Sequence, residues 1–350
     1  MKVIHVNLAS SLSGGEYQTL ALMAGLRDSG VEQCLVHRSK SRVGALARLQ
    51  GLHSLTARRA LVSMRADCWN QPLVLHAHDG RAVHWSKISA VLHAAPYLIT
   101  RRTHTIPSDK RWTHRAYSDA SRVVCVSNAV ANGLQGYDAA LNSCVVHDGV
   151  VGFDSNAEHA ERLRETHAGQ MIIAQVGRLA VEKEVGLTLE VARRLAVENS
   201  PLHFWILGDG PLRDDLRAAA EDLDNVTFFG HRNDIGDFLA AADVLLHPAS
   251  FEALGSVIVE AMQHGVAVVA SRIGGIPEVV VENQTGILLE SGDVDGFYAA
   301  LVELNDKPEL RTRMAKEGRS RARSFSLEVM TESYLEIYRQ CLSERSGTQP

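Results

Sequence analysis

The chain has 350 residues and a formal net charge of −5, and no apolar run approaches the roughly 18 residues that a membrane-spanning helix needs. Its five cysteines lack Cys-x-x-Cys spacing, which argues for reduced thiols and against a zinc site. The length allows two domains with substantial cores. Because the first residues are too short and strand-like for a signal peptide, we expect a cytoplasmic location.

Charge is distributed unevenly along the chain. Through Val150 there are 17 Lys and Arg against 9 Asp and Glu, a net charge of +8, whereas the remainder has 19 against 32, a net charge of −13. A basic first half indicates an anionic partner: a phosphorylated acceptor, a membrane surface or nucleic acid. Nucleic acid is disfavoured because aromatic residues are not interleaved with the charges. Ordinary variation in surface charge is the alternative interpretation.

The first half predicts alternating strands and helices. We expect strands near 2–8, 33–36, 73–79, 97–104, 123–127 and 144–147, and helices over 17–29, 43–50 and 57–67 and from Asn128 onward. The small-residue loop after the first strand contains Gly15. A strand, a Gly-rich loop and a helix form a ligand-facing turn in α/β domains, but the G-x-G-x-x-G dinucleotide spacing is missing.

Basic and histidine residues follow two of these strands. His76 and His78 alternate with apolar neighbours and should point the same way; strand-end hydrogen bonding is favoured over a metal site because no further ligand stands out. After the next strand, cations cluster around His104. They are Arg101, Arg102, Lys110, Arg111 and Arg115. Guanidinium groups bind phosphate or carboxylate oxygens bidentately, so this cluster suits an acidic acceptor.

The second half repeats the alternation more clearly. A polar stretch over 156–170 reads as a helical linker, and the buried strand 171–176 begins a parallel sheet covered on both faces. Arg178 and Lys183 follow that strand. Open α/β sheets bind ligands at the carboxyl ends of their strands, and two cations there suit a diphosphate. Two solvated loop cations are the alternative.

The stretch from His247 to Gly265 reads as a loop feeding a buried helix that Gly255 or Ser256 opens and Gly265 ends. Glu252 precedes this helix and Glu260 lies inside it. A carboxylate in an apolar helix needs partners, since an unpaired buried charge is costly. The partner is either internal or a polyhydroxyl ligand, and the bare N–H groups of the helix start suit a phosphate or sugar oxygen.

Several motifs occur in a characteristic order. They are Gly-Asp-Gly-Pro at 208–211, Val-x-Phe-x-Gly at 226–230, Ala-Asp-Val at 242–244, Pro-Ala-Ser at 248–250, and Glu-x7-Glu at 252–260. This series resembles the retaining glycosyltransferases of the large group 1 family (family 4 type), which have the GT-B fold. The resemblance implies two doubly wound, Rossmann-like parallel-sheet domains facing across a cleft. The expected divisions are 1–155 for the acceptor, 156–170 as linker, 171–326 for the nucleotide sugar, 327–342 as a helix crossing back, and 343–350 as tail.

The resemblance also implies roles for individual residues. Arg178 and Lys183 neutralise the leaving diphosphate, Glu260 accepts from ribose hydroxyls, and Glu252 contacts the sugar. The other expected donor-binding residues are Gly15, His231, Leu254, Gly255 and Ser256, and the expected catalytic set is Glu252, Arg178, Lys183, Arg102 and His104. The sequence departs from the family at three places: Arg102 fills the slot of a His, with His104 two residues later, Asp148 replaces an Asn, and Glu184 replaces a Gly.

We therefore expect transfer of a sugar from a UDP- or GDP-linked donor to a hydroxyl, with retention of configuration. The expected acceptor is an anionic glycan or glycolipid, as in lipopolysaccharide synthesis, with peripheral contact to the inner membrane surface and no nucleic acid partner. No cofactor and no essential metal are expected, because the acidic pairs lack a strand-end context. A nucleotide-sugar hydrolase or epimerase of the same fold, and an inactive carbohydrate-binding relative, are the alternatives.

Overall fold

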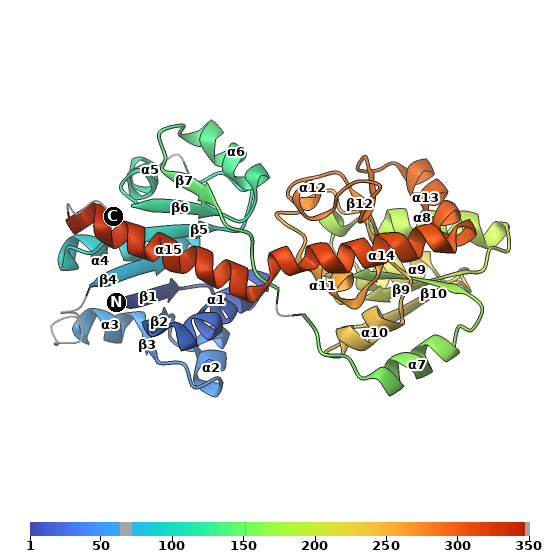
Figure 1. The fold of residues 1–350 in the computed structure, drawn as a ribbon, viewed down its shortest axis with the longest axis horizontal. Coiled ribbons are helices and arrows are strands. Elements are labelled where there is room, and N and C mark those ends of the chain that lie inside the picture. Colours follow the sequence, from blue (N-terminus) through green and yellow to red (C-terminus); the bar gives the residue numbers. More distant parts are fainter. Residues whose placement is uncertain (64–71, 109, 151, 347–350) are drawn as a thin grey trace. The chain divides into compact units, whose positions relative to one another are not determined.

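The computed structural model describes residues 1–63, 72–108, 110–150 and 152–346 (Figure 1). The chain divides into two compact units. The first unit comprises Met1–Gly149 together with the segment from Ser326 onward, and the second comprises Val150–Phe325. No helix among the described residues is both long enough and apolar enough to cross a bilayer.

The first unit contains a seven-stranded sheet in the order β3-β2-β1-β4-β5-β6-β7, with every neighbouring pair parallel. Its strands are β1 (Lys2–Asn7), β2 (Glu32–His37), β3 (Ser54–Thr56), β4 (Leu73–Ala77), β5 (Tyr97–Arg101), β6 (Arg122–Cys125) and β7 (Ser143–Val145). Its helices are α1 (Gly14–Gly25), α2 (Arg42–Leu49), α3 (Ala57–Ser63), α4 (Gly80–His93), α5 (Arg111–Ser118), α6 (Asn128–Tyr137) and α15 (Leu327–Ser346), with the 3₁₀ turn η1 at Leu26–Ser29.

The second unit contains a six-stranded parallel sheet in the order β10-β9-β8-β11-β12-β13. Its strands are β8 (Met171–Val176), β9 (Leu202–Leu207), β10 (Val226–Gly230), β11 (Val244–His247), β12 (Ala267–Ser271) and β13 (Gly286–Leu289). Its helices are α7 (Ala157–Glu165), α8 (Val185–Val197), α9 (Arg213–Ala219), α10 (Ile235–Ala241), α11 (Ser256–His264), α12 (Ile276–Val279), α13 (Val294–Asp306) and α14 (Pro308–Ala322), with 3₁₀ turns η3 (Val181–Lys183) and η4 (Arg323–Phe325).

The core of the second unit lies on both faces of its sheet. Ile172 and Ile173 are consecutive residues of β8, yet they enter two separate clusters of buried side chains. Trp205 and Phe204 of β9 are divided in the same way. Side chains alternate between the faces of a strand, so a strand buried on both faces reads as a continuous apolar run. The predicted class of two doubly wound parallel-sheet units is confirmed.

The C-terminal helix α15 completes the core of the first unit (Figure 1). Tyr334 and Tyr338 are fully buried there, in one cluster with apolar residues of β1, β4 and β5. The helix continues to Ser346, so it includes residues 343–346 that the sequence suggested as tail. Residues 347–350 lie outside the described residues.

Some element boundaries differ from the sequence expectation. The stretch 156–170 contains α7, which belongs to the second unit and packs against α10. The first helix starts at Gly14 rather than Tyr17, because Ser13 and Glu16 form a reciprocal capping box. The short strand β3 and helix α12 were not predicted. Of the helix expected over 57–67, the structure describes Ala57–Ser63, and the remainder lies outside the described residues.

Candidate functional site

In the second unit, two loops meet at the carboxyl edge of the sheet. The backbone N–H of Gly177, after β8, donates to the carbonyl of Leu207, and Leu179 donates to Asp209 in the loop after β9. A Cβ atom at Gly208, whose φ is +141°, would lie only 1.8 Å from the carbonyl oxygen of Gly177. Only glycine allows this backbone approach, which fixes the position of the Gly177-Arg178 turn.

Arg178 is exposed beside a cavity of about 250 Å³ at this edge. It forms no ion pair with any residue that the structure describes. His231, also exposed, lines the same cavity from the loop after β10. The neighbouring Arg232 forms a two-pronged contact with Asp234, with Nε 2.8 Å from Oδ1. Arg178 is therefore the cation of this cavity whose charge is not already offset.

Lys183 and Glu252 were predicted as separate donor contacts, and the structure places them in direct contact. The Nζ atom of Lys183 lies 2.5 Å from Oε2 of Glu252. The same oxygen lies 3.1 Å from Nε2 of His247, a buried residue that ends β11. A carboxylate oxygen only accepts, so the proton of the imidazole belongs on Nε2.

These contacts hold the Glu252 carboxyl ionised. Burial by itself raises the pKa of Glu252, but the hydrogen bond from His247 and the positive charge of Lys183 outweigh it, so the pKa falls to about 2. The pKa of His247 is lowered, chiefly by burial. At neutral pH Glu252 is thus a fixed negative charge that accepts hydrogen bonds, and it cannot donate a proton to a leaving group.

Glu184 stands where the family pattern has glycine, and the structure retains the turn that glycine favours. Glu184 adopts φ +48° and ψ +40°, the left-handed region, between η3 and the start of α8. This conformation costs an L-residue roughly 1–2 kcal/mol relative to glycine. The backbone path through Lys183 is preserved, at the expense of local strain.

The expected helix start near Glu252 is confirmed. Gly255, with φ +92°, precedes α11, and Gly265, with φ +74°, ends it. Leu254 and Gly255 are buried and Ser256 is half-buried. Within α11 the Glu260 carboxyl receives no hydrogen bond from the described residues, and burial raises its pKa to about 7. Glu260 is therefore a half-buried acceptor to which no described residue donates.

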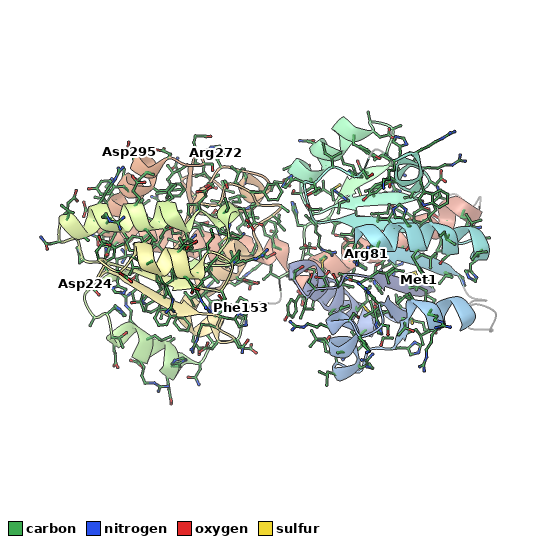
Figure 2. All side chains as sticks on the ribbon, turned by 180° about the vertical axis from the view of Figure 1, so that it is seen from behind. Met1, Arg81, Phe153, Asp224, Arg272 and Asp295 are labelled. Carbon is green, nitrogen blue, oxygen red and sulfur yellow. The ribbon has the colours of Figure 1, made fainter. Side chains whose placement is uncertain are left out.

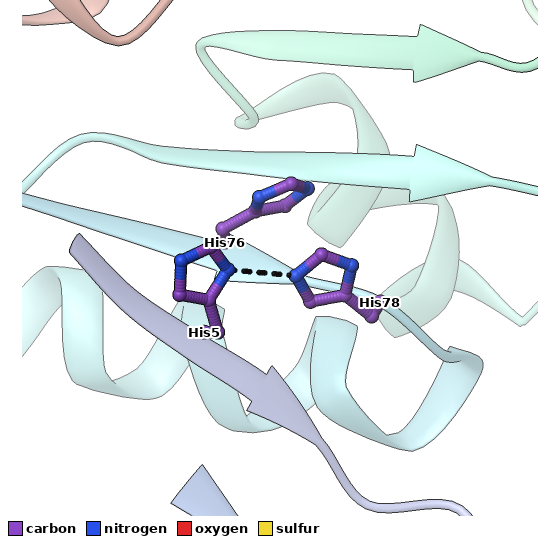
Figure 3. A group of neighbouring side chains, drawn as sticks. All are labelled: His5, His76 and His78. Atoms are coloured by element: carbon purple, nitrogen blue, oxygen red, sulfur yellow. Dashed lines mark hydrogen bonds between the residues drawn. The ribbon is translucent and has the colours of Figure 1, made fainter. Parts of the chain in front are cut away.

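In the first unit, three histidines gather near the carboxyl edge (Figure 3). The rings of His76 and His78 lie 3.8 Å apart between centroids, as their alternation on β4 predicts, and Nδ1 of His5 lies 3.1 Å from Nε2 of His78. Burial lowers the pKa of His5 to about 3 and those of His76 and His78 well below the usual range. All three imidazoles are neutral at pH 7.

The histidines connect the sheet to α15 through hydrogen bonds. Nδ1 of His76 lies 2.8 Å from the hydroxyl of Tyr338, and its Nε2 lies 2.7 Å from the hydroxyl of Thr100. That hydroxyl in turn lies 2.7 Å from the hydroxyl of Tyr334. Because both ring nitrogens of His76 already have protein partners, strand-end hydrogen bonding explains this histidine.

Arg102 and Asp148 form a buried ion pair. Nε of Arg102 lies 2.9 and 3.0 Å from the two carboxylate oxygens of Asp148, and Nη1 lies 3.4 Å from Nδ1 of His78. Burial alone lowers the pKa of Arg102, but the charge of Asp148 raises it on balance. Arg102 and Asp148 are two of the three departures from the family pattern, and the structure shows that they compensate each other.

The other predicted residues of the first unit are less constrained. His104 is half-buried in the loop after β5. A Cβ atom at Gly15 would lie 3.7 Å from Cδ of Arg102, an ordinary contact, so the described residues impose no steric need for glycine there. Arg101 donates to the hydroxyl of Tyr117, while Arg115 lies 3.8 Å from Asp119.

Two groups of described residues could supply three metal ligands each. The first is His5, His76 and His78; the second is His159, Asp234 and Asp237. In the first group the ring nitrogens contact one another, hydroxyl groups or Arg102, except Nε2 of His5, which is buried without a hydrogen-bond partner among the described residues. In the second, Nδ1 of His159 lies 2.7 Å from Asp237, and Arg232 already neutralises Asp234. Their geometry fits hydrogen-bonded clusters, and the expected absence of an essential metal stays a prediction.

Sequence reasoning missed two contributors to these sites. His247 was included in the central stretch without a role, although its place at the end of a buried strand was a usable signal. His5 was overlooked because one histidine inside a strand has no motif around it. Asp148 was noticed as a departure, but its pairing with Arg102, 46 positions away, has no sequence signal.

Residues 158–321 match the family described as glycosyl transferases group 1. Two curated relatives are lipopolysaccharide core biosynthesis glycosyltransferases of Rhizobium meliloti: LpsE, 33% identical over 49% of this chain and 51% of its own length, and LpsD, 25% identical over 99% and 100%. Over residues 158–321, which make up most of the second unit, the chain is similar to the group 1 glycosyltransferases. The match to LpsE thus spans about half of each chain, whereas the match to LpsD spans nearly the whole of both chains.

Solved structures share the fold of this chain over almost its whole length. Anabaena Alr3699/HepE in complex with UDP matches with a TM-score of 0.84 and 19% identity, covering 97% of this chain and 100% of the other. A glycosyltransferase from Rickettsia africae matches with a TM-score of 0.83, also at 19% identity, covering 97% and 98%. The GT-B fold that the resemblance implied is confirmed.

Proposed function

We propose that this glycosyltransferase moves a sugar from a UDP- or GDP-linked donor to an acceptor hydroxyl with retention of configuration, in the synthesis of lipopolysaccharide core or another cell-envelope glycan. The observation that carries the proposal is the edge of the second unit, where Arg178 borders a cavity and Lys183 contacts Glu252. The pathway is supported by the similarity to LpsE and LpsD, two lipopolysaccharide core biosynthesis glycosyltransferases. The UDP-linked donor is supported by Anabaena HepE, which was solved with UDP and with UDP-glucose.

The proposed chemistry follows from charge. When the bond between the sugar and the diphosphate breaks, negative charge grows on the leaving oxygen, and fixed cations stabilise that charge more than the ground state. Arg178 and Lys183 are suited to this role. Glu252, held ionised, accepts from a sugar hydroxyl, and Glu260 accepts from the ribose hydroxyls of the nucleotide. Bare N–H groups at the start of α11 complete the donor site, with the backbone of Leu254 to Ser256 beside them.

Donor binding is the direct test. A panel of UDP- and GDP-sugars is screened by thermal shift, because a ligand that binds only the folded state stabilises it by roughly 2.7 kcal/mol at 100 times its Kd. One nucleotide sugar should raise the melting temperature, and the Glu260→Gln variant should respond less. If none of the panel raises the melting temperature, the proposed function is wrong. Release of free sugar without an acceptor would instead indicate a hydrolase.

We also propose that catalysis needs no metal, because cations and helix dipoles supply the charge that a divalent ion would supply. Turnover is measured with and without EDTA, and it should remain unchanged. Loss of turnover in EDTA, with recovery on adding Mn²⁺ or Mg²⁺, would contradict this. The cytoplasmic location and the contact with a membrane surface stay predictions.

A further inference from the structure

A second cavity lies at the carboxyl edge of the first unit, away from the residues that the motifs selected. Its volume is about 560 Å³, within the usual range for small-molecule sites. The chain segments that follow β1, β2 and β3 line it, together with the start of α4. Its lining residues are Leu8, Arg38, Ser39, Thr56, Ala57, Arg58 and Arg81.

Parallel strands bring these residues together. His37, the last residue of β2, pairs in register with Asn7 of β1 and with Thr56 of β3, so Leu8, Arg38 and Ala57 all emerge from one edge. Arg81 belongs to the first turn of α4, in the first unit (Figure 2). Side chains separated by more than 40 positions along the chain thus surround one space.

The three arginines of this cavity keep their charge available. Arg38, Arg58 and Arg81 are exposed, and none forms an ion pair with a residue in the described part of the chain. The nearest acid in sequence, Asp79, is occupied: its Oδ1 accepts from the backbone of Arg81 and Ala82, and its Oδ2 accepts from the backbone of Leu8. Among the residues that the structure describes, the cavity therefore carries three guanidinium groups and no carboxylate in its lining.

By contrast, most arginines of the cluster after β5, which the sequence favoured as an anion site, already contact other residues. Arg102 pairs with Asp148, and Arg115 lies near Asp119. Arg101 donates hydrogen bonds to the hydroxyl of Tyr117 and to neighbouring backbone carbonyls. Arg111 is exposed on α5 and lines neither of the cavities described above. The exposed arginines Arg38, Arg58 and Arg81 thus line a cavity together, whereas Arg101, Arg102 and Arg115 already contact other residues.

We propose that this cavity binds a phosphate group carried by the acceptor. Guanidinium groups bind phosphate oxygens bidentately, and the hydroxyls of Ser39 and Thr56 offer further donors. The space exceeds a lone phosphate, so a polar group attached to it also fits. The inference rests on the proposed glycosyl transfer and names the chemical class of the acceptor: a phosphorylated glycan or glycolipid.

The first experiment measures phosphate binding without any turnover. Inorganic phosphate, against chloride at matched ionic strength, is titrated into the full chain while the melting temperature is followed. The cavity variant combines Arg38→Gln, Arg58→Gln and Arg81→Gln. Its control combines Arg48→Gln, Arg59→Gln and Arg339→Gln, three exposed arginines of the same unit that do not line the cavity. A third variant, Arg178→Gln with Lys183→Gln, removes phosphate binding at the donor edge.

Phosphate should stabilise the wild type, the control and the donor-edge variant, and should fail to stabilise a protein that combines the donor-edge and cavity substitutions. Retained stabilisation in that combined protein overturns the proposal. Because three substitutions together can disturb folding, Arg38→Lys and Arg81→Lys are also measured singly. Each keeps the positive charge but loses the bidentate geometry of the guanidinium group, so the apparent phosphate Kd should rise. An unchanged Kd in both overturns the bidentate contact.

The second experiment separates an acceptor phosphate from free phosphate. Transfer to one acceptor is measured with its phosphate present and after enzymatic removal. Dephosphorylation should raise the acceptor KM of the wild type roughly 10- to 100-fold, as expected for one or two lost charged hydrogen bonds, and leave that of the cavity variant almost unchanged. Equal sensitivity of both proteins would show that the cavity binds only free phosphate. The donor KM, measured alongside, reports on the proposed function independently.

Discussion

The two units present the same kind of sheet edge, but the motif cations Arg178 and Arg102 have opposite surroundings there. In the second unit Arg178 is exposed beside a cavity, and Glu252 is ionised between Lys183 and His247. In the first unit Arg102 is buried and paired with Asp148 among neutral histidines. The position of a residue in a motif therefore predicts its place at the edge, but its partners decide whether its charge can act on a ligand.

The largest expected effect concerns the buried pair. Asp148→Asn should lower the free energy of unfolding by roughly 3–5 kcal/mol, because it leaves the Arg102 cation buried without a counter-charge. Urea unfolding of the full chain measures it. The double variant Arg102→His with Asp148→Asn, which restores the residue types of the family pattern, should recover most of the loss. The control Asp222→Asn removes the exposed carboxylate of a surface pair with Arg193 and should cost less than about 1 kcal/mol.

If Asp148→Asn cost no more than Asp222→Asn, the Arg102 charge would be solvated, and the contrast between the two edges would be lost.

The second effect concerns catalysis at the other edge. Arg178→Ala and Lys183→Ala should each lower kcat roughly 100- to 1000-fold, the usual result of deleting one group that stabilises transition-state charge. Melting temperatures should change little for Arg178→Ala, which has no described ion-pair partner. Arg193→Ala on α8, whose side chain pairs with Asp222 at the surface, is the matched control and should keep full turnover. Wild-type turnover in Arg178→Ala would show that its exposed charge is not used.

The third effect is a pH dependence that Glu260 imposes on stability. Its folded-state pKa of about 7 lies above its ordinary value of 4.5, so between these values the folded chain keeps a proton that the unfolded chain has lost. Stability should therefore fall as pH rises from 4.5 to 7, by about 3 kcal/mol. Glu260→Gln should remove this loss, so that its advantage in urea unfolding is larger at pH 8 than at pH 5. A pH-independent difference would mean that burial does not raise this pKa.

The smallest effect concerns Glu184. Glu184→Gly should stabilise the second unit by about 0.5–1 kcal/mol, since glycine relieves the left-handed strain but gains freedom in the unfolded chain. Glu184→Ala keeps the strain and serves as the control. Thermal unfolding of the three proteins measures the difference. Destabilisation by glycine would indicate that the Glu184 side chain makes a favourable contribution that outweighs its backbone strain.

Sequence reasoning predicted the second unit better than the first for a physical reason. Strands such as β8 and β9 are buried on both faces, so they stand out as apolar runs between turns. The strand β3 has only three residues, all half-buried, and leaves no such run. Helix α4 has polar residues on several sides and was not singled out, although Asp79 caps its start.

The residues of the candidate site likewise differ in how well the sequence predicts them. Residues inside one motif, such as Glu252 and Glu260, could be selected by spacing. Contacts that join distant segments could not, because the register of the sheet decides them. Lys183 meets Glu252 across 69 positions, and Arg38 shares a cavity with Arg81 only because β2 lies beside β1 and β1 beside β4.

The place of α15 in the chain determines the order in which the two units can be completed during synthesis. All residues of the second unit have been translated once Phe325 is added. The segment Met1–Gly149 of the first unit is translated earlier, but it lacks Tyr334 and Tyr338, and with them the hydrogen bonds to Thr100 and His76, until α15 emerges from the ribosome. While the second unit folds, the first unit therefore exposes the apolar face that α15 later covers. Exposed apolar surface favours aggregation, so this nascent intermediate is the one most in need of a chaperone.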